Sequence, residues 1–251
     1  MKRTVAIAAM EREVQPLVRY WQRTTLSGGD QSWIAFEKDN QALVISGIGK
    51  KNAERAAQAA VTRYQPATLI SAGLAGALIR TLKAGSLVTP NVVVDAADGS
   101  EYRGAAADGG VVGGGILVTA HEIAGIEAKD KLVEQFHALV VDMEAAGVAK
   151  VARDAQISFR CVKAISDEAD FVMPPVAKFV DAAGNFQPGR FAAWAAVRPW
   201  LWARIAALAR NSSKATRALC EWLEKDLFRN MPTEVVTLER AELPDAVSGR
   251  R

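Results

Sequence analysis

The chain has 251 residues, of which half are hydrophobic and about a quarter are charged, a balance that excludes a disordered or fibrous protein. Its 31 basic and 28 acidic residues leave a net charge of +3, too small to indicate a nucleic-acid-binding protein. With two cysteines and two histidines, the chain lacks a disulfide framework and has little material for a zinc site, so we expect no metal and no cofactor.

Strands and helices are predicted to alternate along the chain. The predicted strands lie at 5–9, 32–37, 42–46, 68–71, 86–94, 116–118, 138–141 and 159–165, and the predicted helices at 11–22, 50–64, 143–155, 191–210 and 212–228. Such alternation predicts a single α/β domain with three αβα layers around a mainly parallel, mixed and twisted sheet. Ligands of such sheets bind outside the carboxyl ends of the strands.

Acidic residues stand directly after three of the predicted strands, as the clusters Glu11 and Glu13, Asp142 and Glu144, and Asp167, Glu168 and Asp170. One such acid alone is read most simply as a helix cap or a surface charge. As a set they predict a site, because the carboxyl ends of parallel strands meet at one edge of the sheet. A shielded carboxyl group can hold a proton near neutral pH and donate it, and Asp167 is the natural candidate.

Four motifs resemble the purine nucleoside phosphorylase superfamily in kind and in order: Ala9-Met10-Glu11-Arg12-Glu13-Val14, Ser46-Gly47-Ile48-Gly49-Lys50, Val141-Asp142-Met143-Glu144-Ala145 and Ala164-Ile165-Ser166-Asp167-Glu168-Ala169-Asp170. The resemblance is strongest to the methylthioadenosine/S-adenosylhomocysteine nucleosidases. The loop with Pro174-Pro175 and the long helical tail also resemble the hopanoid-associated phosphorylase group, whose members are linked to removing adenine from adenosylhopane.

The resemblance implies a role for each matched residue. Glu13 would activate the attacking water, Glu144 would bind the ribose hydroxyls with Met143 beside the sugar, and Asp167 would protonate the purine at N7 with Ser166 next to it. The remaining substrate-binding positions would be Ile48, Gly49, Gly73 and Leu74. We expect Lys50 to be an ordinary helix-start residue, because the run around it lacks the spacing of a phosphate-binding P-loop.

The glycine loop decides between water and phosphate as the nucleophile. Phosphorylases of this superfamily hold phosphate there with an arginine and a serine, whereas this chain has Ser71 and Leu74 at those places. Leu74 offers only a backbone amide to an anion. The sequence therefore predicts a purine nucleosidase for an adenosine-type nucleoside, such as methylthioadenosine, S-adenosylhomocysteine or an adenosylhopane-like compound. The alternatives are a phosphate-dependent phosphorylase, with phosphate held by Arg12, Arg80 or Arg103, and a non-catalytic nucleoside-binding protein.

We place the phosphorylase-like catalytic domain with its C-terminal helices at 1–230 and a polar tail at 231–251. The apolar run at 5–10 is too short for a signal peptide, so we expect a cytoplasmic protein. The helices carry Trp194, Trp200, Trp202 and Trp222 among arginines. This composition favours packing or a dimer face, and we expect a homodimer; peripheral membrane contact is the alternative.

Overall fold

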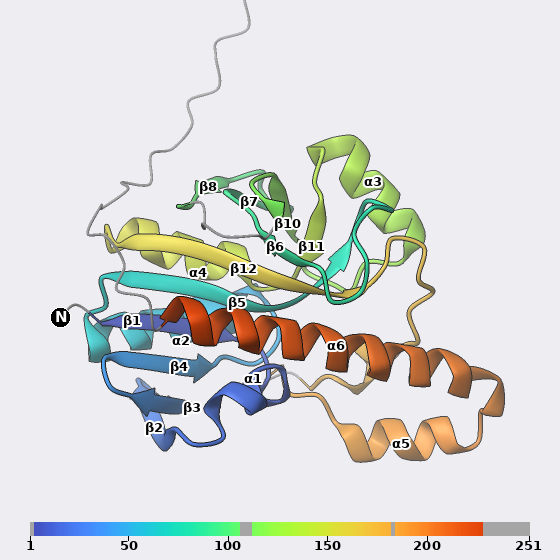
Figure 1. Ribbon diagram of the computed structural model, residues 1–251, viewed down its shortest axis with the longest axis horizontal. Coiled ribbons are helices and arrows are strands. Elements are labelled where there is room, and N and C mark those ends of the chain that lie inside the picture. The colour runs from blue at the N-terminus through green and yellow to red at the C-terminus, as the bar shows by residue number, and fades with distance from the viewer. Residues whose placement is uncertain (1–2, 106–111, 182–183, 228–251) are drawn as a thin grey trace, which may run out of the picture.

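The computed structural model describes residues 3–105, 112–181 and 184–227 (Figure 1). The expected polar tail at 231–251 lies outside the described residues. The strands are β1 (Thr4–Ala8), β2 (Gln22–Gly28), β3 (Gln31–Lys38), β4 (Gln41–Ile45), β5 (Thr68–Ala77), β6 (Leu87–Thr89), β7 (Val92–Asp95), β8 (Glu101–Arg103), β9 (Val112–Gly113), β10 (Ile116–Thr119), β11 (Val140–Asp142) and β12 (Ser158–Asp167).

These strands form one mixed sheet with the order β2-β3-β4-β1-β5-β11-β10-β7-β8, and β12 pairs with both β5 and β6 while β9 pairs with β6. Its centre is parallel: β1 lies between β4 and β5, and β12 runs parallel to β5 along almost its whole length. Antiparallel pairs occur towards the edges and where β11 meets β5. The mainly parallel, mixed sheet that the sequence predicts is thus confirmed.

The helices are α1 (Glu11–Val18), α2 (Lys50–Tyr64), α3 (Ile126–Phe136), α4 (Ala145–Asp154), α5 (Pro188–Ala196) and α6 (Trp202–Leu227), with 3-10 turns η1 (Val176–Phe179) and η2 (Pro199–Leu201). The alanine-rich faces of α2 and α4 pack on one side of the sheet, and α1 and α6 cover the other (Figure 1). Because each face of the sheet is apolar, both must be covered, which gives the three layers.

Two predicted elements are interrupted by proline. The strand predicted at 86–94 is two strands, β6 and β7, separated at Pro90. The break between the last two helices was predicted near residue 211 but falls at 197–201, around Pro199. Proline has no backbone N–H to donate to a sheet or a continuing helix, so these positions end regular hydrogen bonding.

Other boundaries also differ from the prediction. The first helix ends at Val18 instead of Gln22, and the chain then forms β2, which the sequence reading did not predict. Nor did it predict α3. The predicted strand at 68–71 continues through the glycine-rich run to Ala77, where we expected a turn. That run pairs with β12 and, at Gly76 and Ala77, also with β11, and the backbone hydrogen bonds of these strands hold it extended.

Candidate active site

One cavity of about 980 Å³ lies beside the carboxyl ends of the central strands. Its lining includes Glu13 from α1, Glu144 from the turn before α4 and Asp167 from the end of β12. The fold thereby brings together three acids that are more than 150 residues apart from first to last. The cavity has the size expected for a small-molecule site.

The other residues implied by the resemblance lie in or directly behind this lining. Ile48, Leu74, Met143 and Ser166 line the cavity itself. Gly49 and Gly73 lie against two of the carboxylates: the Gly49 N–H donates to Glu144 Oε1 at 2.8 Å, and a Cβ placed on Gly73 would stand 3.2 Å from Glu13 Oε2.

The neighbouring acids of the same clusters face outward. Glu11 pairs with Arg23 at 3.6 Å, and Glu168 pairs with Lys83 at 3.0 Å, both at the surface. Surface ion pairs of this kind contribute little to stability. The reading as surface charge therefore holds for these two acids, and the chemistry of the cavity falls to their neighbours.

Glu13 is buried, and its Oε2 has no hydrogen-bond partner among the residues that the structure describes. Burial, together with the negative charge of Glu144, raises the pKa of Glu13 to about 8, against the opposing charges of Lys163 and Arg12. A carboxyl group with a pKa near neutrality is a stronger base once ionised than an ordinary glutamate. Glu13 is thus suited to accept a proton from a bound water.

Glu144 is held by two backbone donors, the N–H of Gly49 at 2.8 Å from Oε1 and the N–H of Met143 at 3.3 Å from Oε2. Burial and the charge of Asp142 raise its pKa to about 7, although these hydrogen bonds and Lys163 favour ionisation. The contact to Gly49 requires α2 and α4 to approach closely. A Cβ on Gly147 would lie 2.3 Å from the carbonyl oxygen of Lys50, so only glycine fits there.

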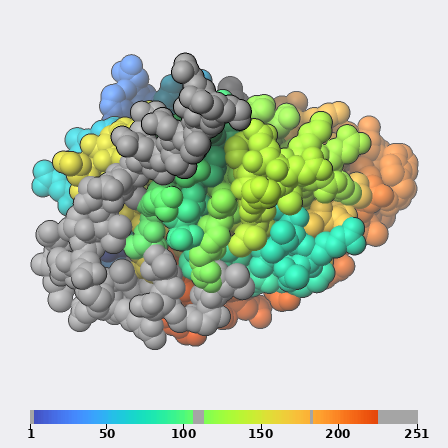
Figure 2. Space-filling model, turned by 90° about the horizontal axis from the view of Figure 1, so that it is seen from above, coloured from blue at the N-terminus to red at the C-terminus, as the bar shows by residue number. Residues whose placement is uncertain are grey.

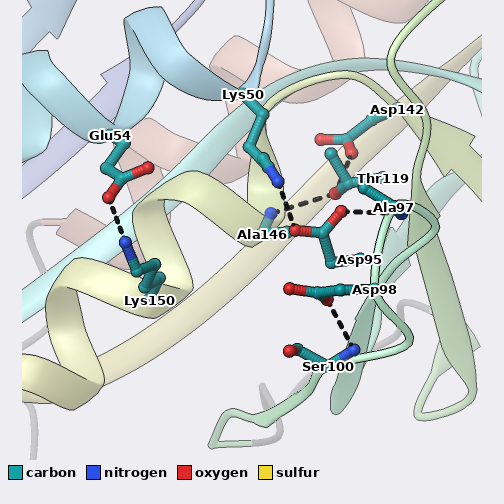
Figure 3. A network of polar contacts seen from close by, with 10 residues as sticks. All are labelled: Lys50, Glu54, Asp95, Ala97, Asp98, Ser100, Thr119, Asp142, Ala146 and Lys150. Atoms are coloured by element: carbon teal, nitrogen blue, oxygen red, sulfur yellow. Dashed lines mark hydrogen bonds and ion pairs between the residues drawn. The ribbon is translucent and has the colours of Figure 1, made fainter.

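Asp142 is fixed by a buried network, of which Figure 3 shows the contact with Thr119. Its Oδ1 accepts a hydrogen bond from Thr119 Oγ1 at 2.7 Å, and its Oδ2 accepts from the backbone N–H of Ala145 at 2.9 Å. Lys163 Nζ lies 2.8 Å from the same Oδ2. Asp142 thus satisfies an N–H group at the start of α4 and neutralises a lysine inside the sheet.

Lys163 comes from the middle of β12 and is 1% exposed. Burial lowers its pKa, but the charge of Asp142 and further acidic neighbours outweigh this effect and raise the pKa overall. Its ammonium group therefore stays charged and attracts the carboxylates of Glu13 and Glu144. The sequence reading missed Lys163, although a lysine within an apolar strand is a signal that could have identified it.

Lys50 begins α2, as expected, and its Nζ binds Asp95 Oδ2 at 2.5 Å (Figure 3). The hydrogen bond to Asp95 raises the pKa of Lys50. Together with the negative charge of Asp95 it outweighs burial, which lowers the pKa. This pair joins the start of α2 to the end of β7, outside the cavity lining. Lys50 acts as a structural link between the two elements.

Asp167 is held from two sides. Ser166 Oγ donates to Asp167 Oδ1 at 2.9 Å, and Lys129 Nζ lies 2.5 Å from Oδ2. Lys129 comes from α3, and its side chain is 3% exposed. The sequence reading missed this residue, because α3 was not predicted and no motif includes Lys129.

The far side of the cavity is built by the C-terminal third of the chain and combines apolar with polar side chains. Its apolar lining consists of Met173, Val176, Val180, Phe186, Phe191, Ile205 and Leu208. These residues come from η1, α5, the first turns of α6 and the loops around them. Later turns of α6 add the polar lining residues Ser212, Ser213, Thr216, Arg217, Glu221 and Glu224. The beginning of α6 and α5 also form one end of the molecule, the orange surface in Figure 2. The cavity is therefore polar at the strand ends and apolar where η1, α5 and the first turns of α6 line it.

The four tryptophans of the tail divide into two pairs. Trp222 is buried beneath Arg160, and Trp194 packs against Phe179 with ring centroids 5.5 Å apart. Trp200 and Trp202 are 70% and 54% exposed. The packing interpretation accounts for the first pair and leaves the second pair at the surface.

The described residues contain no group of three or more histidine, cysteine, aspartate or glutamate side chains that could hold a metal ion. Within the same part of the chain, each helix is too short or too polar to cross a membrane.

Both cysteines are buried and unpaired, and burial raises the pKa of the Cys161 thiol to about 12. Such a thiol is a core group and a poor nucleophile.

A family model described as the phosphorylase superfamily matches residues 3–114 and 103–187. The 5′-methylthioadenosine/S-adenosylhomocysteine nucleosidase of Lysinibacillus sphaericus is 33% identical over 90 residues, which span 35% of this chain and only 39% of that protein.

Three solved structures are similar to this chain. The methylthioadenosine/S-adenosylhomocysteine nucleosidase of Neisseria meningitidis, in complex with methylthio-immucillin-A, has a TM-score of 0.68 at 18% identity and covers 90% of this chain and 99% of its own. The methylthioadenosine nucleosidase of Arabidopsis thaliana has a TM-score of 0.66 at 17% identity, covering 92% and 98%. Futalosine hydrolase of Helicobacter pylori has a TM-score of 0.63 at 16% identity, covering 90% and 97%. At these identities the likeness shows the fold.

Proposed function

The chain belongs to the phosphorylase superfamily, and from this premise we propose that it hydrolyses the N-glycosidic bond of an adenosine-type purine nucleoside. One observation carries the proposal: Glu13, Glu144 and Asp167 line a single cavity at the carboxyl ends of the strands. Breaking a glycosidic bond requires a base for the nucleophile, an acid for the leaving group, and contacts that strengthen as the sugar gains positive charge. A protein that only bound nucleosides would need just the last of these.

In the proposed reaction each carboxyl group has a separate task. Glu13, once ionised, takes a proton from the water that attacks C1′ of the sugar. Glu144 accepts hydrogen bonds from the ribose hydroxyls, and its negative charge stabilises the oxocarbenium-like transition state. Asp167 delivers a proton to N7, so that the base leaves as a neutral purine. Met143 and Ile48, which also line the cavity, pack beside the sugar.

The glycine loop supports water as the nucleophile. Ser71, which replaces the arginine of the phosphorylases, is fully buried within β5, and Leu74 presents an apolar side chain to the cavity. Arg12 does line the cavity, and its guanidinium lies 5.0 Å from the centre of the Phe186 ring. Arg12 lies on the same helix as Glu13, and this position favours the phosphorylase alternative.

The apolar side of the cavity supports a substrate with a large apolar 5′ substituent. A cavity of about 980 Å³ is at the upper end of the range for small-molecule sites, and part of it is lined by Phe191, Ile205 and their apolar neighbours. Burial of apolar substituents contributes about 0.8 kcal/mol per CH₂ group. An adenosylhopane-like nucleoside fits this arrangement better than methylthioadenosine does.

Such a substrate resides in a membrane, and the exposed tip between α5 and α6 supports contact with one. Val197, Trp200 and Trp202 expose large apolar side chains there; Arg198 stands between them in the sequence and Arg204 follows them. Tryptophan and arginine side by side are typical of surfaces that lie at the lipid headgroups. A homodimer and a cytoplasmic location remain predictions.

The deciding experiment is product analysis. Purified protein is incubated with adenosine, methylthioadenosine, S-adenosylhomocysteine and adenosylhopane, each with and without phosphate. We expect free purine and a free sugar in both conditions, and the highest kcat/KM for the nucleoside with the largest apolar group. A phosphate requirement with a sugar 1-phosphate as product would assign the phosphorylase reaction instead, and binding without turnover would leave a nucleoside-binding protein.

A further inference from the structure

Lys129 occupies a position that neither the matched motifs nor the proposed division of labour explains. Its Nζ lies 2.5 Å from Asp167 Oδ2 and donates to the backbone carbonyl of Glu168 at 2.9 Å. Its side chain is 3% exposed and lines the cavity. The side chain of Glu168 points to Lys83 on the surface, so Asp167 is the carboxylate that Lys129 meets inside the protein.

This ion pair conflicts with a simple acid role for Asp167. Both carboxyl oxygens of Asp167 already have a donor beside them, Lys129 Nζ at 2.5 Å from Oδ2 and Ser166 Oγ at 2.9 Å from Oδ1. A general acid must carry a proton when the bond breaks. In the resting protein the nearest transferable proton lies on Lys129.

We propose that Lys129 supplies the proton that Asp167 delivers to the purine. The inference rests on the proposed nucleosidase function. As the C1′–N9 bond breaks, its electrons move into the base and N7 becomes basic. A proton passes from Lys129 Nζ to Asp167, and a carboxyl proton passes from Asp167 to N7. The base leaves neutral, Asp167 is again a carboxylate, and Lys129 is left as a neutral amine. Glu13 holds the proton of the attacking water, and exchange with solvent restores both residues.

Two variants separate proton supply from mere positioning. Lys129→Arg keeps the charge and the hydrogen-bond donors, but arginine does not release its proton in proteins. Lys129→Met removes the cation and its proton, and leaves Asp167 to take its proton from solvent. If Lys129 supplies the proton, the conservative variant should lose more activity than the drastic one. We expect kcat on the nucleoside to be highest for the wild type, intermediate for Lys129→Met and lowest for Lys129→Arg. A positioning role through charge predicts the reverse, with arginine replacing lysine well.

The measurement is kcat and KM for a purine nucleoside and for p-nitrophenyl riboside, whose leaving group needs no proton. We expect Lys129→Arg to lose about a hundredfold in kcat or more on the nucleoside, with KM little changed, and to stay within a few-fold of wild type on p-nitrophenyl riboside. Lys131→Arg, on the exposed side of the same helix, is the matched control and should match wild type on both substrates.

An Lys129→Arg protein as active as the wild type, or more active than Lys129→Met, would overturn the proposal. So would equal losses on both substrates, because a distorted cavity affects both reactions. Failure of the proposed function looks different: the wild type itself would then cleave neither substrate.

Discussion

The two sides of the cavity differ in chemistry and in the way they are built. The polar side consists of carboxylates that follow β1 and β11 or end β12, and hydrogen bonds and ion pairs with lysines of α3 and β12 fix these groups and their neighbour Asp142. The apolar side comes largely from η1, α5 and the first turns of α6, whereas later turns of α6 add polar lining residues such as Ser212 and Glu221. The match to the phosphorylase superfamily ends at residue 187, directly before α5 begins at Pro188.

This difference suggests how reaction and substrate choice are separated in the molecule. Positions that handle protons must be fixed to within a fraction of an ångström, which a buried parallel sheet provides. A wall that only excludes water from an apolar group can vary in sequence, because hydrophobic contact is not directional. We therefore expect variants on the polar side to affect turnover of every nucleoside, and variants on the apolar side to affect only some.

The largest effect is expected at Asp167. Asp167→Asn should lower kcat on purine nucleosides by about a hundredfold to ten-thousandfold, because asparagine can hydrogen-bond N7 but cannot deliver a proton. The activated substrate p-nitrophenyl riboside should recover much of that rate. Thermal unfolding of the same variant and of Glu168→Gln, the neighbouring surface acid, serves as the control. Equal loss on both substrates would remove Asp167 as the acid.

The second largest effect is expected at Glu13 and Glu144, whose variants should differ in how strongly they bind a nucleoside. Glu13→Gln should lower kcat by about a hundredfold or more while a nucleoside analogue still binds, because the base acts on water and not on the ligand. Glu144→Gln should weaken both binding and turnover, because its ribose contacts form in the ground state and tighten in the transition state. Isothermal titration and steady-state kinetics measure the two. Glu11→Gln, which alters a surface ion pair, is the control.

The pH dependence tests the same residue without a mutation. The pKa of Glu13 is raised to about 8, so below that pH the free protein holds the proton and lacks its base. The value of kcat/KM should therefore rise about tenfold per pH unit from pH 6 and level off near pH 8. In Glu13→Gln, kcat/KM should be low and nearly independent of pH between pH 6 and pH 8. A rate that is independent of pH across this range would contradict Glu13 as the base.

A smaller and more selective effect is expected on the apolar side. Ile205→Ser should raise KM about tenfold for a nucleoside with a long apolar 5′ chain, which corresponds to the loss of one or two buried methylene groups. Turnover of adenosine itself should be unchanged. Ala206→Ser, the exposed neighbour on α6, is the matched control. An equal change for both substrates would mean that the apolar side is part of the general nucleoside site.

The smallest effect is expected at the exposed tip. Replacing Trp200 and Trp202 by alanine should weaken sedimentation of the protein with vesicles that contain anionic phospholipid, with no change in turnover of adenosine. Tyr20→Ala, another exposed aromatic side chain, is the control. If the double variant instead changes the mass measured by light scattering, the tip is a face between two copies of the chain.

The individual elements show how far local sequence carries a prediction. The helix predicted at 50–64 has those bounds in the structure, because its glycine start and its alanine-rich run leave few alternatives. The glycine-rich run after residue 71 was misjudged as a turn, because its extended shape comes from strands distant in sequence. For α3 there was no comparable start signal, and the residue before it, Gly125, makes no side-chain cap.

The sequence by itself determined the alternation of strands and helices, and therefore the position of Glu13, Glu144 and Asp167 at strand ends. These are local properties: apolar periodicity, turns and the motifs that follow them. Only the tertiary structure decided which charges meet. Lys129 reaches Asp167 across 38 residues and Lys163 reaches Asp142 across 21, and both contacts depend on how α3 and β12 pack. Because a buried charge is stable only with its partner, the partners of these acids could be identified only after the chain was folded.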